Sequence, residues 1–253
     1  MKDRIKEFWD QQSLQFGGSH GASWEDRFMI DLEVSTIGGY IKDGDSVLDV
    51  GCANGHATFL QAEKHALKSI AGIDFSDNMI QSALAVKAER KLAHMDFSVG
   101  DIRQIGFSDS SFDVVYTTRV LINLPTWEEQ KIGIRECLRV VKSGGKVVLS
   151  EAFWEPLAVL NALRALKGLK SLEEHDFNRY LKKERLEEYL LRAKVSFEVN
   201  DFSSIYYLGS RFLRDLLGLQ GYENELNKEF FRLEQKFSGG GLGIQQAYVL
   251  TKP

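Results

Sequence analysis

The fold is decided by the stretch Ser46-Val47-Leu48-Asp49-Val50-Gly51-Cys52-Ala53-Asn54-Gly55-His56. Its apolar first half predicts a buried strand, which runs into a turn of small residues and then into a helix over 57–67. Gly51 and Gly55 let the backbone bend sharply and approach a ligand without a Cβ clash. Asp49 lies inside the strand that precedes this turn. Proteins that bind a dinucleotide at such a turn usually have an apolar residue or glycine at that position. The turn therefore favours a nucleotide-sized ligand that carries a cationic group.

Two more acids follow at the ends of the next two predicted strands. Asp74 ends the second strand, and Asp101 closes the third. A carboxylate at the position of Asp74 can accept hydrogen bonds from both hydroxyls of a ribose, as in the wider doubly wound class. One strand-end acid alone is more often a solvated turn than a ligand. Three in succession favour a shared binding site.

Short β-branched segments alternate with amphipathic segments from residue 46 onward, which is the pattern of parallel strands joined by helices. Before them, residues 1–45 predict a helix, a glycine loop and a second helix. The helix over 126–141 ends at Ser143-Gly144-Gly145, where glycine supplies a left-handed stop. A helix-rich run is predicted over 156–194 and further helix over 203–238. The predicted strands cover 47–50, 69–74, 96–99, 112–117, 145–151, 195–200 and 245–251.

The segment from Asp49 to Gly55 resembles the acid-x-Gly-x-Gly-x-Gly loop of class I S-adenosylmethionine-dependent methyltransferases of the small-molecule type. Ala53 replaces the middle glycine, so we expect the loop to keep its shape unless this position needs a positive φ. Residues 112–118 and 138–145 are similar to later motifs of the family, and the resemblance covers about residues 41–151.

This resemblance implies a fold, a cofactor and a set of binding residues. The fold is a doubly wound, seven-stranded, mostly parallel sheet of the Rossmann-like α/β class, with an N-terminal helical lid over 1–45. The methyltransferase domain would span 46–253, with helical cap inserts at about 152–194 and 203–240. Asp101 would accept from the adenine amino group and Ile102 would pack on the ring. The residues expected to bind S-adenosylmethionine are Asp49, Gly51, Ala53, Gly55, Asp74, Phe75, Asp101, Ile102, Thr117 and Thr118.

Candidates for acceptor binding and catalysis lie beyond the strand ends. Arg119, in an otherwise apolar run, either clamps an anionic group of the acceptor or cofactor or forms a structural ion pair. Glu151 is a candidate base or amine anchor, or a solvated or capping residue. His20, between glycines, is a candidate catalytic residue in a mobile lid, or an ordinary turn histidine. The other candidates for acceptor binding are Trp24, Asn123, His175, Tyr206 and Tyr207, although aromatic pairs are more often core packing.

Composition restricts the partners. The formal net charge of −4 supplies no basic footprint for nucleic acid. No apolar run approaches the roughly 20 residues of a membrane span, and the N-terminus lacks a signal sequence, which together predict a cytoplasmic protein. Two cysteines, Cys52 and Cys137, are too few for a disulfide framework, and no metal-ligand spacing is present.

The sequence therefore predicts an enzyme that transfers methyl from S-adenosylmethionine to O or N of a small polar metabolite, such as a sugar, surface-polysaccharide or natural-product intermediate. The product would be S-adenosylhomocysteine, and the chain would act as a monomer or homodimer. Two alternatives remain open: a cofactor-binding partner protein without transfer activity, and a methyltransferase that acts on RNA or protein.

Overall fold

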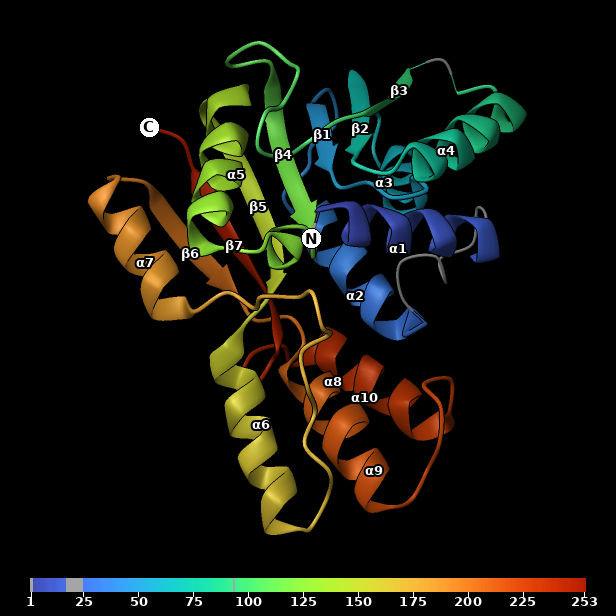
Figure 1. Ribbon diagram of the computed structural model, residues 1–253, viewed down its shortest axis with the longest axis vertical. Helices are drawn as coiled ribbons and strands as arrows, with labels where there is room; N and C mark the ends of the chain where they lie inside the picture. The colour runs from blue at the N-terminus through green and yellow to red at the C-terminus, as the bar shows by residue number, and fades with distance from the viewer. Residues whose placement is uncertain (1, 17–24, 93) are drawn as a thin grey trace.

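A computed structural model describes residues 2–16, 25–92 and 94–253. Its centre is a seven-stranded sheet in the order β3-β2-β1-β4-β5-β7-β6 (Figure 1). Neighbours from β3 to β5 are parallel, and β7 runs antiparallel to both β5 and β6. The predicted α/β fold with a mostly parallel sheet is confirmed. The strands are β1 (Ser46–Val50), β2 (Ser69–Asp74), β3 (Met95–Val99), β4 (Phe112–Thr118), β5 (Val141–Ala152), β6 (Ser196–Asn200) and β7 (Gln245–Thr251).

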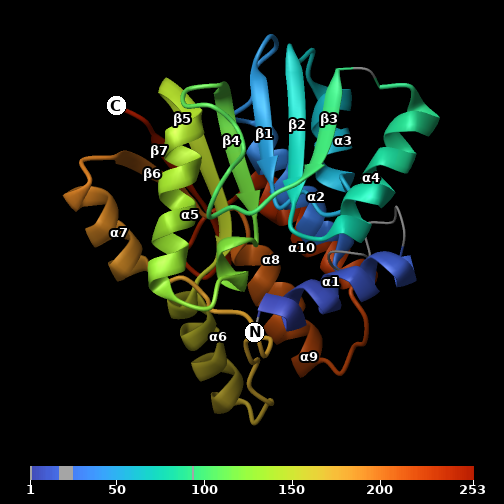
Figure 2. The same cartoon turned by 45° about the horizontal axis from the view of Figure 1, so that its top comes forward.

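Helices cover both faces of the sheet and gather beyond its carboxyl edge (Figure 2). Side-chain caps start several of them: the Asp26 carboxylate accepts the N–H of Met29, and Thr126 accepts that of Glu129. The helices are α1 (Lys2–Phe16), α2 (Arg27–Gly38), α3 (His56–Lys64), α4 (Asp77–Arg90), α5 (Trp127–Val140), α6 (Trp154–Leu166), α7 (Lys183–Arg192), α8 (Ser204–Leu208), α9 (Arg214–Leu216) and α10 (Glu225–Lys236).

Alternate residues of the strands feed two separate hydrophobic cores. Val47 faces the core that contains Met29 of α2 and Phe59 of α3, whereas its neighbour Leu48 faces the core that contains Ile134 of α5. Burial on both faces explains why the parallel strands read as continuous apolar runs in the sequence. It also fixes their register, because a shift of one residue would exchange the two faces.

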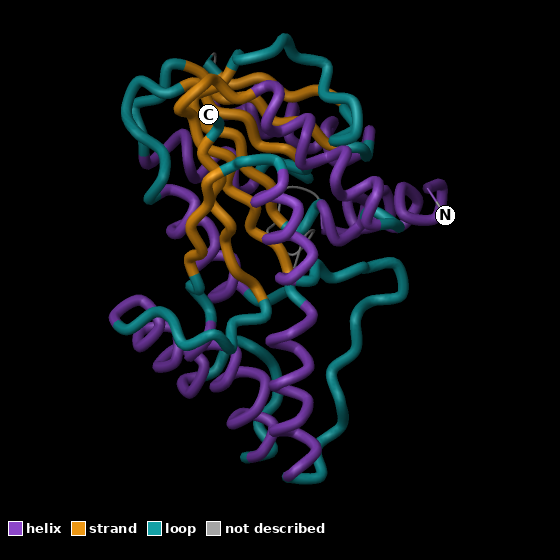
Figure 3. Tube along the Cα trace, turned by 90° about the vertical axis from the view of Figure 1, so that its left-hand side faces the viewer, coloured by secondary structure: helices purple, strands orange, loops and turns teal. Residues whose placement is uncertain are grey.

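A group of helices lies beyond the carboxyl ends of β1, β4 and β5 (Figure 3). This cap consists of α6, the segment 167–182 and the helices α8 to α10. The prediction of a helix-rich run over 156–194 was wrong for residues 167–182, which contain no helix. Residues 203–238 do not form the continuous helix that was predicted. A five-residue π-helix, Gly209–Leu213, and a non-helical segment over 217–224 interrupt the α-helical structure there. Helix α7 packs on the sheet through Leu186 and Leu190.

The transition from α5 to β5 differs from the prediction in its boundary. Gly144 has a φ of +75°, the left-handed conformation that the sequence indicated. The chain is nevertheless already extended at Val141, and β5 begins there instead of at residue 145. Val141 pairs with Phe112, and the register shifts between Phe112 and Val114, so the glycines lie within a strand irregularity.

Candidate functional site

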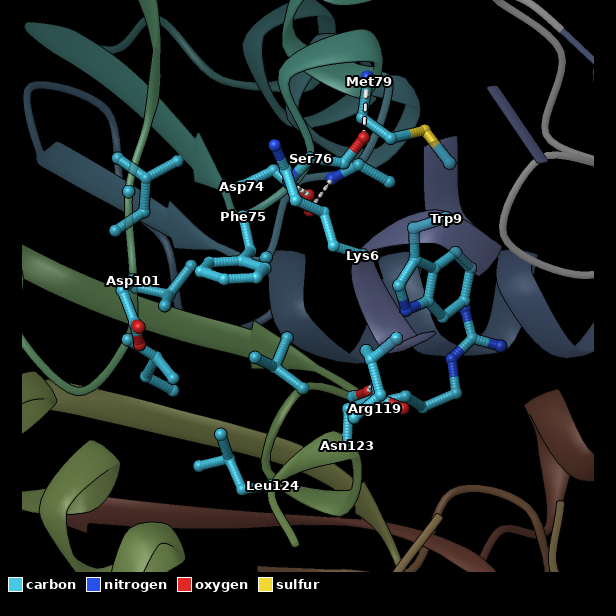
Figure 4. A pocket seen from close by; sticks show the side chains of 18 of the residues that line it. Lys6, Trp9, Asp74, Phe75, Ser76, Met79, Asp101, Arg119, Asn123 and Leu124 are labelled. Atoms are coloured by element: carbon cyan, nitrogen blue, oxygen red, sulfur yellow. Dashed lines mark hydrogen bonds between the residues drawn. The ribbon is translucent and has the colours of Figure 1, made fainter. Parts of the chain in front are cut away.

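A large cavity lies at the carboxyl ends of β1, β2 and β4 and is covered by α1 (Figure 4). Its volume is about 1020 Å³, including the part open to solvent, which suits a nucleotide-sized ligand. The strand ends, α1 and the segment after β4 all contribute to its wall. The lining residues are Ile5, Lys6, Trp9, Val50, Gly51, Ala53, Ile73–Ser76, Met79, Gly100–Arg103, Thr118–Val120 and Asn123–Pro125.

The glycine turn after β1 is packed tightly against its neighbours. Gly51 has a φ of +80°, and a Cβ there would lie 2.1 Å from Cγ2 of Val120. Gly55 also has a φ of +80° and would meet the ring of Phe97 at 2.9 Å. Ala53, the residue in place of the middle glycine, has a φ of +48°. The position therefore does require the left-handed conformation, which costs an alanine roughly 1–2 kcal/mol.

Asp74 connects the end of β2 to the glycine turn. One carboxylate oxygen accepts the N–H of Ala53 at 2.9 Å, and the other accepts the N–H of Ser76 at 2.8 Å. Burial raises the pKa of Asp74 to about 6. Each carboxylate oxygen can accept a further bond, and the residue lines the large cavity. Asp74 thus presents acceptors to a ligand while it holds the turn in place.

An apolar slot lies next to Asp74, with a charged pair at its end. The ring of Phe75 and the side chain of Ile102 both line the cavity, and Phe75 is 38% exposed. Asp101 accepts two hydrogen bonds from the guanidinium of Arg103, at 2.8 and 2.5 Å. Asp101 and Arg103 line the same cavity, and the Arg103 guanidinium carbon lies 6.0 Å from the centre of the Phe75 ring.

Asp49 lies behind the glycine turn and is 1% exposed. Its Oδ2 accepts hydrogen bonds from Thr58 Oγ1 at 2.6 Å and from the Tyr116 hydroxyl at 2.8 Å. Its Oδ1 is buried and has no hydrogen-bond partner among the described residues. Burial raises the pKa of Asp49 to about 7. The residue lines a second cavity of about 430 Å³, which shares Gly51, Ala53, Thr118 and Arg119 with the first.

The Glu151 side chain holds the segment after β4 in place. The Glu151 carboxylate is fully buried and accepts the Thr117 hydroxyl at 2.8 Å. It also accepts the N–H groups of residues 120, 121 and 122 at 3.1–3.4 Å. Glu151 lines neither cavity, so the structure gives it no path to act as a base on a ligand. Its observed role is to hold the turn that carries Arg119 and Asn123, both of which line the large cavity.

Comparison with known proteins identifies the family of this chain. A family model described as a methyltransferase domain matches residues 41–205. The chain belongs to this methyltransferase family. The match starts just before β1 and includes all of the strand ends that form the two cavities.

Two curated relatives carry specific methyltransferase names. A phosphoethanolamine N-methyltransferase of Triticum aestivum is 34% identical over 111 residues, which are 44% of this chain and 21% of that protein. A demethylmenaquinone methyltransferase of Staphylococcus aureus (strain JH9) is 33% identical over 147 residues, which are 56% of this chain and 55% of that protein. This chain therefore spans only part of the length of these relatives.

A solved structure confirms the fold. The geranyl diphosphate C-methyltransferase of Streptomyces coelicolor A3(2), in complex with Mg²⁺, geranyl diphosphate and S-adenosyl-L-homocysteine, superposes with a TM-score of 0.59 at 12% identity. The superposition covers 90% of this chain and 82% of the other. The Rossmann-like methyltransferase fold thus extends over most of the chain.

Within this methyltransferase domain, most of the predicted cofactor residues line at least one of the two cavities, and Gly51, Ala53 and Thr118 line both. The exceptions are Gly55, the N-cap residue of α3, and Thr117, which is buried against Glu151. Of the predicted acceptor residues, Arg119 and Asn123 line the large cavity. His20 and Trp24 lie outside the described residues.

The aromatic acceptor candidates of the methyltransferase lie elsewhere. The Tyr206 hydroxyl donates to Asp26 at 2.6 Å, and both Tyr206 and Tyr207 are buried in the core beside the cap. The His175 ring lies 4.4 Å from that of Phe177 and 5.4 Å from that of Phe8 in α1. None of the three lines either cavity. The prediction that they would form a pocket wall is not supported by their positions.

Three site residues were missed from the sequence. Lys6 and Trp9 line the large cavity from α1, which is anchored to the start of α4 by an ion pair of Lys6 with Asp77 and a hydrogen bond of Ser76 with Asp10. Nothing in the polar pattern of residues 2–16 marked this contact. Glu33 lines the small cavity, and its signal was an acid among the apolar residues Leu32 and Val34.

No group of three or more His, Cys, Asp or Glu side chains in the described parts of the chain could hold a metal ion. No described helix is both long and apolar enough to cross a membrane.

Proposed function

We propose that this protein transfers the methyl group of S-adenosylmethionine to an oxygen or nitrogen of a small polar metabolite. The observation that carries the proposal is the convergence of Asp49, Asp74 and Asp101 on two cavities that share four lining residues beside one glycine turn. Membership of a methyltransferase family and two relatives named for small-molecule acceptors support it.

The residues fit the parts of this cofactor one by one. Asp74 would accept hydrogen bonds from the ribose hydroxyls. Phe75 and Ile102 would enclose the adenine, and Asp101 would accept from its amino group. Asp49 would face the α-ammonium of the methionine part, and its buried Oδ1, which has no partner among the described residues, fits that cationic group.

The cofactor supplies an activated methyl group on a positively charged sulfur. Transfer is an in-line displacement: the acceptor's lone pair forms a bond to the methyl carbon while the carbon–sulfur bond breaks, and the acceptor then loses a proton. The protein gains most by alignment and by exclusion of water. Trp9 and Lys6 cover the cavity from α1, which we propose acts as part of an N-terminal lid formed by residues 1–45.

The acceptor would meet Asn123 in the large cavity, which favours a polar molecule, and Arg119, which lines both cavities, would meet an anionic group of either the acceptor or the cofactor. A sugar, surface-polysaccharide or natural-product intermediate remains the proposed class. An amine that carries an anionic group, as in the substrate named for the wheat relative, also fits Arg119. We further propose a cytoplasmic monomer or homodimer that acts without nucleic acid.

The substitution Asp74→Ala tests cofactor recognition directly. Calorimetry with S-adenosylhomocysteine should show a dissociation constant that rises about tenfold or more, as loss of a charged hydrogen bond predicts. Asp96→Ala is a matched control, because the Asp96 side chain is 87% exposed on the neighbouring strand and faces neither cavity. Unchanged affinity in Asp74→Ala would contradict the assignment.

An acceptor panel tests the transfer itself. Release of S-adenosylhomocysteine should depend on an added small polar amine or alcohol. A protein that binds the cofactor and methylates no member of a broad panel would instead be a cofactor-binding partner. Tight binding of RNA that weakens steeply with salt would point to a nucleic-acid acceptor.

A further inference from the structure

The small cavity has an unusual set of charges. Its wall contains two carboxylates that are each 1% exposed, those of Glu33 and Asp49, and one guanidinium, that of Arg119. Burial raises the pKa of both acids. If both acids are ionised, the three side chains carry a net charge of −1. The amino-acid part of S-adenosylmethionine with its sulfonium carries one negative and two positive charges, a net of +1, so the two sets are complementary.

Arg119 is held in a strained backbone conformation at the junction of the two cavities. Its φ is +56°, which is uncommon for a residue with a side chain. Its N–H donates to the carbonyl of Ser150 at 2.8 Å, and its own carbonyl accepts from Asn123 Nδ2 at 3.0 Å. Residues in such conformations persist where the surrounding structure fixes them, and they gather at ligand sites.

Glu33 contacts the guanidinium end of the Arg119 side chain. Its Oε2 lies 3.6 Å from a guanidinium nitrogen of Arg119. Its Oε1 accepts the Ser150 hydroxyl at 2.6 Å and the side-chain amide of Gln245. Glu33 is therefore anchored to β5 and β7 while it faces the end of β4. This arrangement leaves the guanidinium little freedom to turn away from the shared wall.

Resting on the proposed function, we infer that Arg119, positioned by Glu33, binds the α-carboxylate of the cofactor, while Asp49 faces the α-ammonium. Arg119 is the only Lys or Arg in the wall of the small cavity among the described residues, and Asp49 lines the same cavity. A guanidinium is also the side chain best matched to a carboxylate. The alternative is that Arg119 binds an anionic group of the acceptor from the large cavity.

Ligands that differ only in the carboxylate test the inference on the unmodified protein. Decarboxylated S-adenosylhomocysteine keeps the ammonium and the thioether and lacks the carboxylate. Calorimetry should show that the protein binds S-adenosylhomocysteine at least about tenfold more tightly than this analogue. Equal affinity for the two ligands would overturn the inference. No binding of S-adenosylhomocysteine at all would instead contradict the proposed function.

Variants then assign the discrimination to Arg119. Arg119→Gln should bind both ligands with the weaker affinity, and Arg119→Lys should recover part of the preference. 5′-Methylthioadenosine, which lacks the whole amino-acid chain, is the control and should bind all variants alike. If Arg119→Gln kept the preference and showed only a raised KM for the acceptor, Arg119 would belong to the acceptor site.

Glu33→Gln separates positioning from direct contact. It should weaken S-adenosylhomocysteine binding by roughly threefold to tenfold, less than Arg119→Gln, and leave 5′-methylthioadenosine unchanged. The double variant should bind no more weakly than Arg119→Gln alone, because Glu33 acts through Arg119. Additive losses would show that Glu33 does not work through the guanidinium.

Discussion

The cofactor side and the cap of this protein are built by different means. On the cofactor side, each of the first three strands delivers one acid to the cavities, and the turn between β1 and α3 lies within a single short segment. In the cap, stability depends on buried polar pairs between distant segments, such as Asp26 with Arg211 and Arg164 with Asp215. A local pattern in the sequence can specify the first kind of structure. The second exists only after distant parts of the chain have met.

The largest effect is expected where the cap joins α2. Asp26 is fully buried, and Arg211 Nη2 lies 2.6 Å from one of its oxygens. Arg211→Met would leave the carboxylate without its charged partner and lower the free energy of unfolding by about 3–5 kcal/mol. Urea titration would measure the loss. Since Arg211 lines neither cavity, the dissociation constant of S-adenosylhomocysteine for the folded variant should stay within about twofold.

The control for this prediction is an ion pair of the same type on the surface. Arg192 and Glu188 lie one helical turn apart in α7, with side chains 78% and 59% exposed. Arg192→Met should change the free energy of unfolding by no more than about 0.5 kcal/mol. A similar small change in Arg211→Met would mean that the cap does not depend on its buried pair.

The next effect is on the cofactor side, at Gly51. In Gly51→Ala the new Cβ would collide with Val120, in a backbone conformation that disfavours any side chain. We expect the free energy of unfolding to fall by about 2–4 kcal/mol and cofactor binding to weaken at least tenfold. Gly44→Ala is the matched control: its φ is +85°, but nothing lies within 4 Å of a Cβ there. It should lose only about 1–2 kcal/mol and keep its affinity. Equal losses in the two variants would show that the contact with Val120 is unimportant.

The clustering of Asp49, Asp74 and Asp101 could be predicted from the sequence because its signals are local. An acid at or near the end of each of the first three strands and glycines at fixed offsets bring these residues together as soon as the strands pair in parallel. The boundary of β5 was missed because Val141 becomes extended by pairing with Phe112, which a helical pattern in the preceding residues cannot show.

Glu151 shows the limit of the same reasoning: the sequence left it open between a base or amine anchor and a capping or solvated residue, and in the structure its carboxylate accepts the N–H groups of residues 120–122. In the sequence it resembles the other strand-end acids. Its surroundings depend on the turn about 30 residues earlier, whose N–H groups enclose the carboxylate. For Glu33 the sequence predicted no role at all, since an acid on a helix gives no sign that Arg119 will lie next to it. The roles of Glu151 and Glu33 depend on contacts with residues that are distant in the sequence.

A smaller effect on cofactor binding is expected from pH. Burial raises the pKa of Asp49 to about 7, and a cationic ligand group favours the ionised carboxylate. Affinity for S-adenosylhomocysteine should therefore be full above pH 7 and be lost as the pH falls, by about tenfold from pH 8 to pH 6. The unliganded protein should show the opposite sign: because the folded pKa lies above the ordinary value of 3.8, the contribution of Asp49 to stability is lost as the pH rises through about 7.

The variant Asp49→Asn is the control for this pH dependence. It cannot ionise at residue 49, so its weaker affinity should vary less between pH 8 and pH 6, with Asp74 responsible for the remaining change near its pKa of about 6. An unaltered pH profile in Asp49→Asn would assign the titration to another group.

The smallest effect should come from Ala53, the one departure from the glycine pattern. Ala53→Gly removes the strain of an alanine in the left-handed conformation, which stabilises the fold by about 1–2 kcal/mol. It also makes the unfolded chain more flexible, which lowers stability by about 0.4–1 kcal/mol. The net result should be a gain between about zero and about 1.6 kcal/mol, with a rise in Tm of roughly 2–4 °C for each kcal/mol gained. Ala85→Gly, the same substitution on the exposed face of α4, should instead lose about 1 kcal/mol. Opposite signs in the two variants would show that the loop keeps its shape at a cost in backbone strain. Equal losses would mean that residue 53 does not occupy the left-handed region, and that alanine serves this turn as well as glycine does.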